Sequence, residues 1–226
     1  KLIFKEELIP ANADKLIFIL APVITVIPAL VITAVIPWGT EVPLFGRMVS
    51  LHLADINVGI LYIMSVTSIS VYGITLAGWS SNNKYAMLGG MRATAQMISY
   101  ELALGLSFIG PMLWAGSMKL SDIVNAQSNV WFVVYMPLGF IIFFIASMAE
   151  INRAPFDMPE AEQELTAGYH TEYSGMKFAL FFMAEYIKMI GIAMIGSTLF
   201  LGGYRGPLVD VYPALGPLYL VIKIIL

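Results

Sequence analysis

The chain has 226 residues, of which 59% are hydrophobic and only 12% charged, with a formal net charge of −3 at pH 7. Soluble domains carry roughly 25% charged residues, so this composition predicts an integral membrane protein. Cysteine is absent, and the only histidines are His52 and His170. Disulfides, thiolate metal sites and cysteine nucleophiles are therefore excluded, and too few ligands remain for a haem or a histidine-rich metal centre.

The first ten residues, KLIFKEELIP, suit either a short helix in the membrane interface or the end of a preceding span. A first span is predicted over about 15–36, which is long enough to cross a hydrocarbon core of ~30 Å. Pro22 and Pro28 interrupt its backbone hydrogen bonds, so neighbouring groups must bond to the freed carbonyls.

A second span is predicted over about 55–76, after a loop over 37–53. Its small and hydroxyl side chains, in the run MSVTSISVYGIT, suit close helix packing. Asp55 at its start either caps the helix or takes part in ion traffic.

A third span, over about 88–113, follows a polar turn and is unusually polar for a membrane helix. At 100° per residue, Glu101 and Arg92 lie on different faces and do not pair within their own helix. A carboxylate inside the membrane is a functional candidate by default. The alternative is a protonated glutamate that is hydrogen-bonded to a neighbouring helix.

Three further spans are predicted, over about 131–149, 178–201 and 215–226, the last of them cut off by the end of the sequence. Glu185 and Lys188 lie three residues apart on one helical face, either as an internal ion pair or as functional groups. The predicted fold is an all-α polytopic membrane protein, a tilted transmembrane helix bundle. Residues 1–226 are expected to form a single membrane domain.

A long acidic loop is predicted over 150–177, with Arg153 as the main basic residue among its acids. Glu160 and Glu164 would share a helical face after Pro159, where like charges raise one another's pKa and titrate as a set. A solvated loop is the alternative. Packing is favoured because aromatic and aliphatic residues alternate with the acids, namely Phe156, Leu165, Tyr169 and Tyr173.

Lysine and arginine counts on the two sides place this loop in the cytoplasm. Seven basic residues share its side, namely Lys1, Lys5, Lys15, Lys84, Arg92, Arg153 and Lys177, against Arg47, Lys119 and Arg205 on the other. The carboxylates form a series, with Glu101 and Glu185 inside spans, Glu150 and Glu172 at span ends, and the Glu160 group outside. Such a series suggests a stepped polar route into the membrane.

Two stretches closely resemble the signatures of one family, the membrane subunit that joins the two arms of NADH:quinone oxidoreductase (respiratory complex I), also known as NADH dehydrogenase chain 1. They are GWSSNNKYAMLGGMRATAQMISYE (78–101) and AEINRAPFDMPEAEQELTAGYHTEYSGMKFALFFMAEY (149–186), and the resemblance runs through essentially all 226 residues. It implies eight spans, of which this sequence would hold the second through most of the seventh.

The resemblance also implies a mechanism. Such a subunit forms much of the tunnel by which a quinone approaches an iron–sulfur cluster in a soluble neighbour. Carried over residue by residue, the resemblance implies a proton relay of Glu101, Glu150 and Glu185 with Glu172, and a quinone-cavity and loop group of Arg153, Phe156, Asp157, Glu160, Glu162 and Glu164. His170 stands where the family more usually has asparagine, and it could add a titratable group near pH 6.5.

Quinone is the implied substrate. NAD, FMN and the iron–sulfur clusters are expected only in partner subunits, so this chain would hold no metal and carry out no electron transfer. The implied partners are the soluble quinone-reducing and iron–sulfur subunits, the small and antiporter-like membrane subunits, and membrane lipid, but no nucleic acid. The implied location is the bacterial inner membrane, with the mitochondrial inner membrane as the alternative.

Two other interpretations stay open. One is the equivalent subunit of a membrane-bound hydrogenase or of the photosynthetic ferredoxin:plastoquinone complex, although the run EINRAPFD favours the respiratory form. The other is a proton-coupled secondary transporter. No internal repeat and no matched pair of broken helices supports the transporter.

Overall fold

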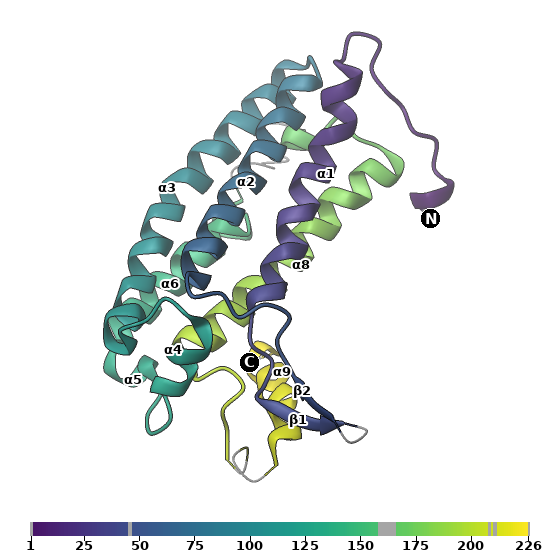
Figure 1. The fold of residues 1–226 in the computed structure, drawn as a ribbon. Coiled ribbons are helices and arrows are strands. Elements are labelled where there is room, and N and C mark those ends of the chain that lie inside the picture. The colour runs from purple at the N-terminus through teal and green to yellow at the C-terminus, as the bar shows by residue number, and fades with distance from the viewer. Residues whose placement is uncertain (1, 45–46, 158–165, 208, 210–211, 226) are drawn as a thin grey trace. The chain divides into compact units, whose positions relative to one another are not determined.

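The computed structural model describes residues 2–44, 47–157, 166–207, 209 and 212–225. These residues are largely helical (Figure 1). The longer helices are α1 (Lys15–Ile32), α2 (Gly59–Ser80), α3 (Lys84–Ala115), α6 (Pro137–Glu150), α8 (Gly175–Phe200) and α9 (Gly216–Ile225). The short elements are α4 (Leu120–Ala126), α5 (Phe132–Tyr135), β1 (Glu41–Leu44), β2 (Arg47–Ser50) and 3-10 turns at Leu2–Phe4, Thr33–Val35, Gly168–His170 and Pro213–Leu215.

Within the described residues, four helical segments are long and apolar enough to cross a membrane. They are Lys15–Val35, Gly59–Ser80, Lys84–Ala115 and Gly175–Phe200. The prediction of an all-α membrane protein is confirmed. The shorter apolar helices Pro137–Glu150 and Pro213–Ile225 lie where the fourth and sixth spans are expected, and their crossing of the membrane stays a prediction, as does a single membrane domain.

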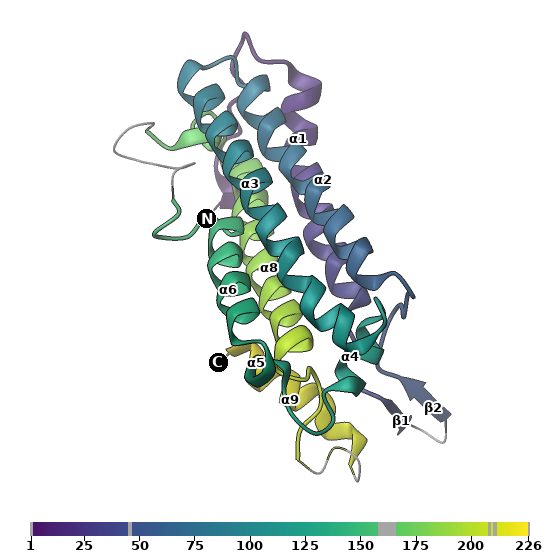
Figure 2. The same cartoon turned by 90° about the vertical axis from the view of Figure 1, so that its left-hand side faces the viewer.

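The chain separates into two compact units, each of three segments. Unit 1 comprises Lys1–Leu30, Ser65–Leu102 and Ile145–Met189, and unit 2 comprises Val31–Met64, Ala103–Phe144 and Ile190–Leu226. In unit 1, α1 and α2 lie side by side (Figure 1, Figure 2). The core of unit 1 joins α1, α2, α3 and α8 to the end of the acidic loop through Phe18, Ala21, Val71, Ile74, Ala77, Ala93, Met97, Tyr169, Tyr173 and Phe181.

The end of the acidic loop packs closely on α3 of unit 1. A Cβ at Gly89 would lie 2.7 Å from both the Cα of Gly168 and the backbone nitrogen of Tyr169, so only glycine permits this approach. Gly168 itself has a φ of +61°. The contact seats Tyr169 and Tyr173 in the core, where they are 7% and 5% exposed. The packed loop end agrees with the aromatic pattern, and it argues against a fully solvated loop.

Tyr173 bonds to a carbonyl that a proline leaves without its usual donor. Pro22 has no N–H for the carbonyl of Phe18 four residues earlier. The Tyr173 hydroxyl donates to that carbonyl at 3.2 Å, and its ring stacks on Phe18 with centroids 4.0 Å apart. Burial raises the pKa of Tyr173 to about 12, so the hydroxyl keeps its proton.

Replacing Tyr173 by phenylalanine is expected to lower the free energy of unfolding by about 1 to 2 kcal/mol, because the ring stays but the buried carbonyl of Phe18 loses its donor. Denaturant unfolding of the full-length protein in detergent would measure the loss. The control is Tyr72→Phe, at a tyrosine that is 66% exposed, and it should change little. Equal effects of the two substitutions would contradict the role of the Tyr173 hydroxyl as donor to the Phe18 carbonyl.

The ends of the helices differ from the predicted span limits. α2 continues to Ser80 and α3 begins at Lys84, so the polar turn is only three residues long. The side-chain oxygen of Asn83 accepts the N–H of Tyr85 at 2.9 Å and thereby caps α3. At the start of unit 1, the short interfacial helix is reduced to the 3-10 turn Leu2–Phe4.

Unit 2 contains a β-hairpin and a short helix where the sequence predicts only loops. β1 and β2 pair antiparallel, with Val42 opposite Val49. Asp55 does not cap α2, which starts four residues later at Gly59. Its carboxylate instead pairs with Lys119 at 2.8 Å and accepts a hydrogen bond from Ser121 of α4 at 3.0 Å. The capping prediction was therefore wrong.

Candidate functional site

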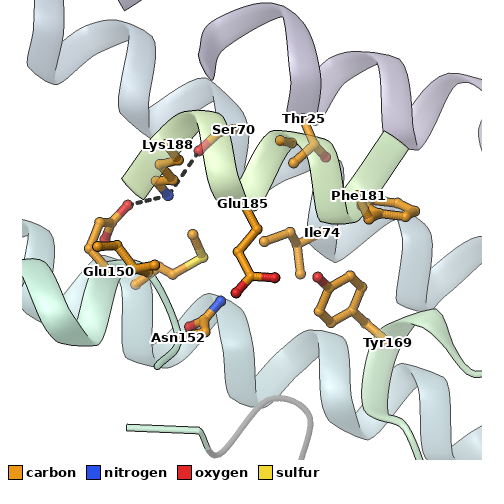
Figure 3. A pocket seen from close by; sticks show the side chains of 12 residues that line it. Thr25, Ser70, Ile74, Glu150, Asn152, Tyr169, Phe181, Glu185 and Lys188 are labelled. Carbon is orange, nitrogen blue, oxygen red and sulfur yellow. Dashed lines mark hydrogen bonds and ion pairs between the residues drawn. The ribbon is translucent and has the colours of Figure 1, made fainter. Parts of the chain in front are cut away.

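A buried ion pair lies at the end of α6 in unit 1. Lys188, on α8, places its Nζ 2.6 Å from an oxygen of Glu150, the last residue of α6. Glu150 is 1% exposed and Lys188 is 8% exposed. The Nζ of Lys188 also lies 3.4 Å from the hydroxyl of Ser70 on α2 (Figure 3). Three helices thus bring a carboxylate, an ammonium and a hydroxyl together at one buried place.

A second ion pair lies beside the first. The Nε of Arg153, in the turn after α6, is 3.1 Å from an oxygen of Glu185 on α8. The Arg153 guanidinium also lies over the ring of Tyr186, 5.3 Å from its centroid. The prediction that Glu185 pairs with Lys188 is therefore wrong. Each of the two residues pairs instead with a residue from the segment around the end of α6.

Residues of both pairs line a small cavity of about 30 Å³, although Arg153 itself does not. Glu150, Asn152, Glu185 and Lys188 line it, together with Thr25, Ser70, Ile74, Met97, Ile151, Tyr169, Phe181 and Ala184 (Figure 3). One water needs roughly 10–15 Å³ of such space and two or more polar partners, so the cavity has room for about two waters. The second oxygen of Glu150 is buried and has no hydrogen-bond partner among the residues that the structure describes. The size and the lining suit water, whereas a quinone ring does not fit.

Glu101 lies outside this cavity but close to it. Its carboxylate accepts hydrogen bonds from the hydroxyls of Ser68 and Thr67 on α2, the second over 3.4 Å. It also interacts electrostatically with Glu150. This geometry matches the hydrogen-bonded alternative for Glu101, and its place in a relay stays a prediction.

Glu172 is not brought to the cavity. One of its oxygens accepts a 2.6 Å hydrogen bond from Asn83, and it lines a separate polar hollow with Pro10, Ala11, Asn12, Ser81, Asn82, Asn83, Lys84 and Tyr85. In the acidic loop, the ring of Phe156 packs edge-on against Tyr100 at 5.2 Å, and Asp157 is exposed. The predicted loop residues Glu160, Glu162 and Glu164 lie outside the described residues.

His170 is buried among aromatic rings rather than poised to titrate. It is 7% exposed, and the rings of Tyr169, Phe178 and Phe182 meet its imidazole edge-on. Burial lowers the pKa of His170 to about 4. The prediction of a group that titrates near pH 6.5 was therefore wrong, because the aromatic surroundings disfavour the charged imidazolium.

Sequence reasoning left Lys188 without an assigned role and attached no function to Ser68, Ser70 or Gln96. The run MSVTSISVYGIT does contain the signal for the serines. Its hydroxyl side chains all lie on α2, and Ser68 and Ser70 both form hydrogen bonds to charged groups of neighbouring helices. Within the described ranges, no three His, Asp or Glu side chains gather as a metal ion would require.

Comparison with known proteins gives a consistent family. The family model described as NADH dehydrogenase matches residues 1–226. The chain is 56% identical over 207 residues to an H-type NADH-quinone oxidoreductase subunit of Geobacter metallireducens, covering 92% of this chain and 63% of that protein. The corresponding NADH-quinone oxidoreductase subunit of Protochlamydia amoebophila is 53% identical, and the match covers 92% of this chain and 64% of that protein. The chain thus spans less than two thirds of the length of these relatives.

Proposed function

Since the chain belongs to the NADH dehydrogenase family, we propose that it is part of a membrane subunit of an NADH–quinone oxidoreductase, in which its buried carboxylates hand on protons linked to quinone reduction. The names of its relatives support the respiratory form over the hydrogenase and photosynthetic alternatives. Quinone is then the substrate of the whole complex, while NAD, FMN and iron–sulfur clusters belong to partner subunits. The bacterial inner membrane is the proposed location.

One observation carries the proton-transfer proposal: Glu150 and Glu185 line the same cavity, and each has a cationic partner. Reduction of a quinone takes up two electrons and two protons, so it changes the charge nearby. Carboxylates that depend on an ion pair in a poorly hydrated site respond to such a change, because electrostatic interactions are stronger there than in water.

The geometry gives each residue a role in this proposal. Arg153 holds the Glu185 carboxylate at the side of the acidic loop, and the Arg153 side chain is 42% exposed there. Lys188 is within direct proton-transfer distance of Glu150. Water in the cavity would bridge Glu185 to the Lys188–Glu150 pair, and Glu101 with Ser68 would extend the path along α2 and α3. Phe156 and the rest of the loop are proposed to face the quinone cavity and the soluble subunits.

The test is Glu150→Gln and Glu185→Gln in the full-length protein within the assembled complex. Each variant is expected to slow quinone reduction and its coupled proton uptake by roughly tenfold or more, since a general acid–base group contributes about 100-fold or more. Proton uptake would be followed with a pH-sensitive dye in vesicles. The control is Glu7→Gln, because Glu7 pairs with Lys177 and is not among the residues that line the cavity. Normal rates and normal proton uptake in both variants would refute the relay.

A further inference from the structure

Gln96 of α3 holds the turn that carries both ion pairs. It is 9% exposed. Its side-chain nitrogen lies 2.9 Å from the carbonyl oxygen of Ala149, 2.8 Å from that of Phe156 and 3.2 Å from the side-chain oxygen of Asn152. All three acceptors belong to the segment 149–156, which also contains Glu150 and Arg153. One side chain therefore binds both ends of this segment.

The turn has backbone hydrogen bonds of its own, and Gln96 adds side-chain bonds to both of its ends. α6 ends at Glu150, and Asn152 has a φ of +56°. The last carbonyls of a helix have no intrahelical partner. That of Ala149 accepts a hydrogen bond from the N–H of Asn152 at 3.3 Å and a shorter one from Gln96 at 2.9 Å. Inside the turn, the N–H of Phe156 donates to the carbonyl of Arg153 at 2.7 Å. A primary amide has two N–H groups, so the two shortest bonds, to Ala149 and Phe156, occupy both.

We propose that Gln96 is a positioning residue for the proton relay, holding the 149–156 turn so that Glu150 meets Lys188 and Arg153 meets Glu185. This inference rests on the proposed function. Glu150 directly follows one anchored carbonyl, and Arg153 lies midway between the two anchors. The hydrogen bonds of Gln96 go to Ala149, Asn152 and Phe156, so its effect on the ion pairs passes through the turn.

The role requires a donor of this length. Leucine at position 96 fills a similar volume but donates no hydrogen bond, so the carbonyl of Phe156 loses its bond from Gln96 and that of Ala149 keeps the longer bond from Asn152. Glutamate has the same shape, yet an ionised carboxylate only accepts hydrogen bonds and would face three oxygen acceptors. A protonated glutamate regains one O–H donor. Gln96→Leu and Gln96→Glu therefore separate loss of packing from loss of donors.

The first measurement is quinone reduction by the assembled complex with the full-length chain. Gln96→Leu is expected to lower kcat by roughly tenfold while the KM for quinone stays within about twofold, since misplacing a reacting group by ~1 Å can cost about 100-fold. For Gln96→Glu, the rate relative to the unsubstituted complex should rise as the pH falls from about 8 to about 6. Nearby Glu150, Arg153, Glu185 and Lys188 are present in both proteins, so the ratio isolates position 96.

The second measurement does not depend on activity. A double-mutant cycle of Arg153→Met and Glu185→Gln would be followed by the thermal unfolding midpoint, with and without Gln96→Leu. With Gln96 in place, the shift in midpoint of the double variant should differ from the sum of the two single shifts. With Gln96→Leu, it should equal that sum. Unchanged coupling would overturn the positioning role. Lost coupling with normal turnover would support the positioning role and refute the proposed relay instead.

Gln96→Glu also serves if Gln96→Leu does not assemble. Activity that returns at low pH shows that the isosteric variant is folded, and it supports the need for a donor. A ratio that stays flat across the same pH range would overturn the proposal.

Discussion

Replacing Lys188 by methionine is expected to lower the free energy of unfolding by about 3 to 5 kcal/mol, because it leaves the Glu150 carboxylate buried without its cation. Glu150 is 1% exposed, and Lys188 approaches one of its oxygens to 2.6 Å. Among the described residues, the other oxygen already lacks a hydrogen-bond partner, so no second cation is in place to replace Lys188. Denaturant unfolding of the full-length protein in detergent near pH 7 would measure the loss.

The matched control is Lys177→Met. Lys177 pairs with Glu7 at the same 2.6 Å, but the Glu7 side chain is 43% exposed. Water replaces the lost cation there, and we expect a change of only about 0 to 1 kcal/mol. Comparable losses at positions 177 and 188 would show that burial does not set the strength of the Lys188–Glu150 pair.

The double variant Lys188→Met with Glu150→Gln should recover most of the lost stability, since no buried charge then remains unpaired. Quinone-coupled proton uptake should nevertheless stay low in the double variant. This divergence of stability from activity would indicate that the pair is kept for proton transfer rather than for folding. Recovery of both would point to a structural pair.

Helices that bury apolar residues against one another were predictable, because long uncharged runs have few other stable forms in a membrane. The runs that form α1 and α2 are examples. The sequence also singled out Glu150 and Glu185, since carboxylates beside such runs are costly. Short elements were missed. The hairpin of β1 and β2 contains Pro43, which weakens a strand pattern, and α4 has only seven residues.

Partners were harder to predict than positions. Helical spacing brings Glu185 and Lys188 to one face, yet it says nothing about which groups that face meets. The observed choice depends on where α6 ends and on how the next turn folds back, and Gln96 forms hydrogen bonds to both ends of that turn. Asp55 is a similar case, because its partners Lys119 and Ser121 come from a segment more than 60 residues away.

His170 should make the protein lose stability as the pH falls from about 6.5 to about 4. Burial lowers its pKa to about 4 in the folded chain, whereas an unfolded chain protonates it near 6.5. The unfolded state then binds the proton more readily. The stabilisation is therefore complete above pH 6.5 and is lost progressively as the pH falls to about 4. The difference of about 2.5 between the two pKa values corresponds to about 3 kcal/mol of unfolding free energy.

His170→Asn removes this titration and keeps a polar side chain. The difference in unfolding free energy between the two proteins should therefore change by about 3 kcal/mol between pH 7 and pH 4, while other acids titrate in both and cancel. Parallel pH profiles would contradict the burial of neutral His170. Because a group with this pKa stays neutral at physiological pH, the proposed proton transfer near the loop involves the carboxylates and not the imidazole.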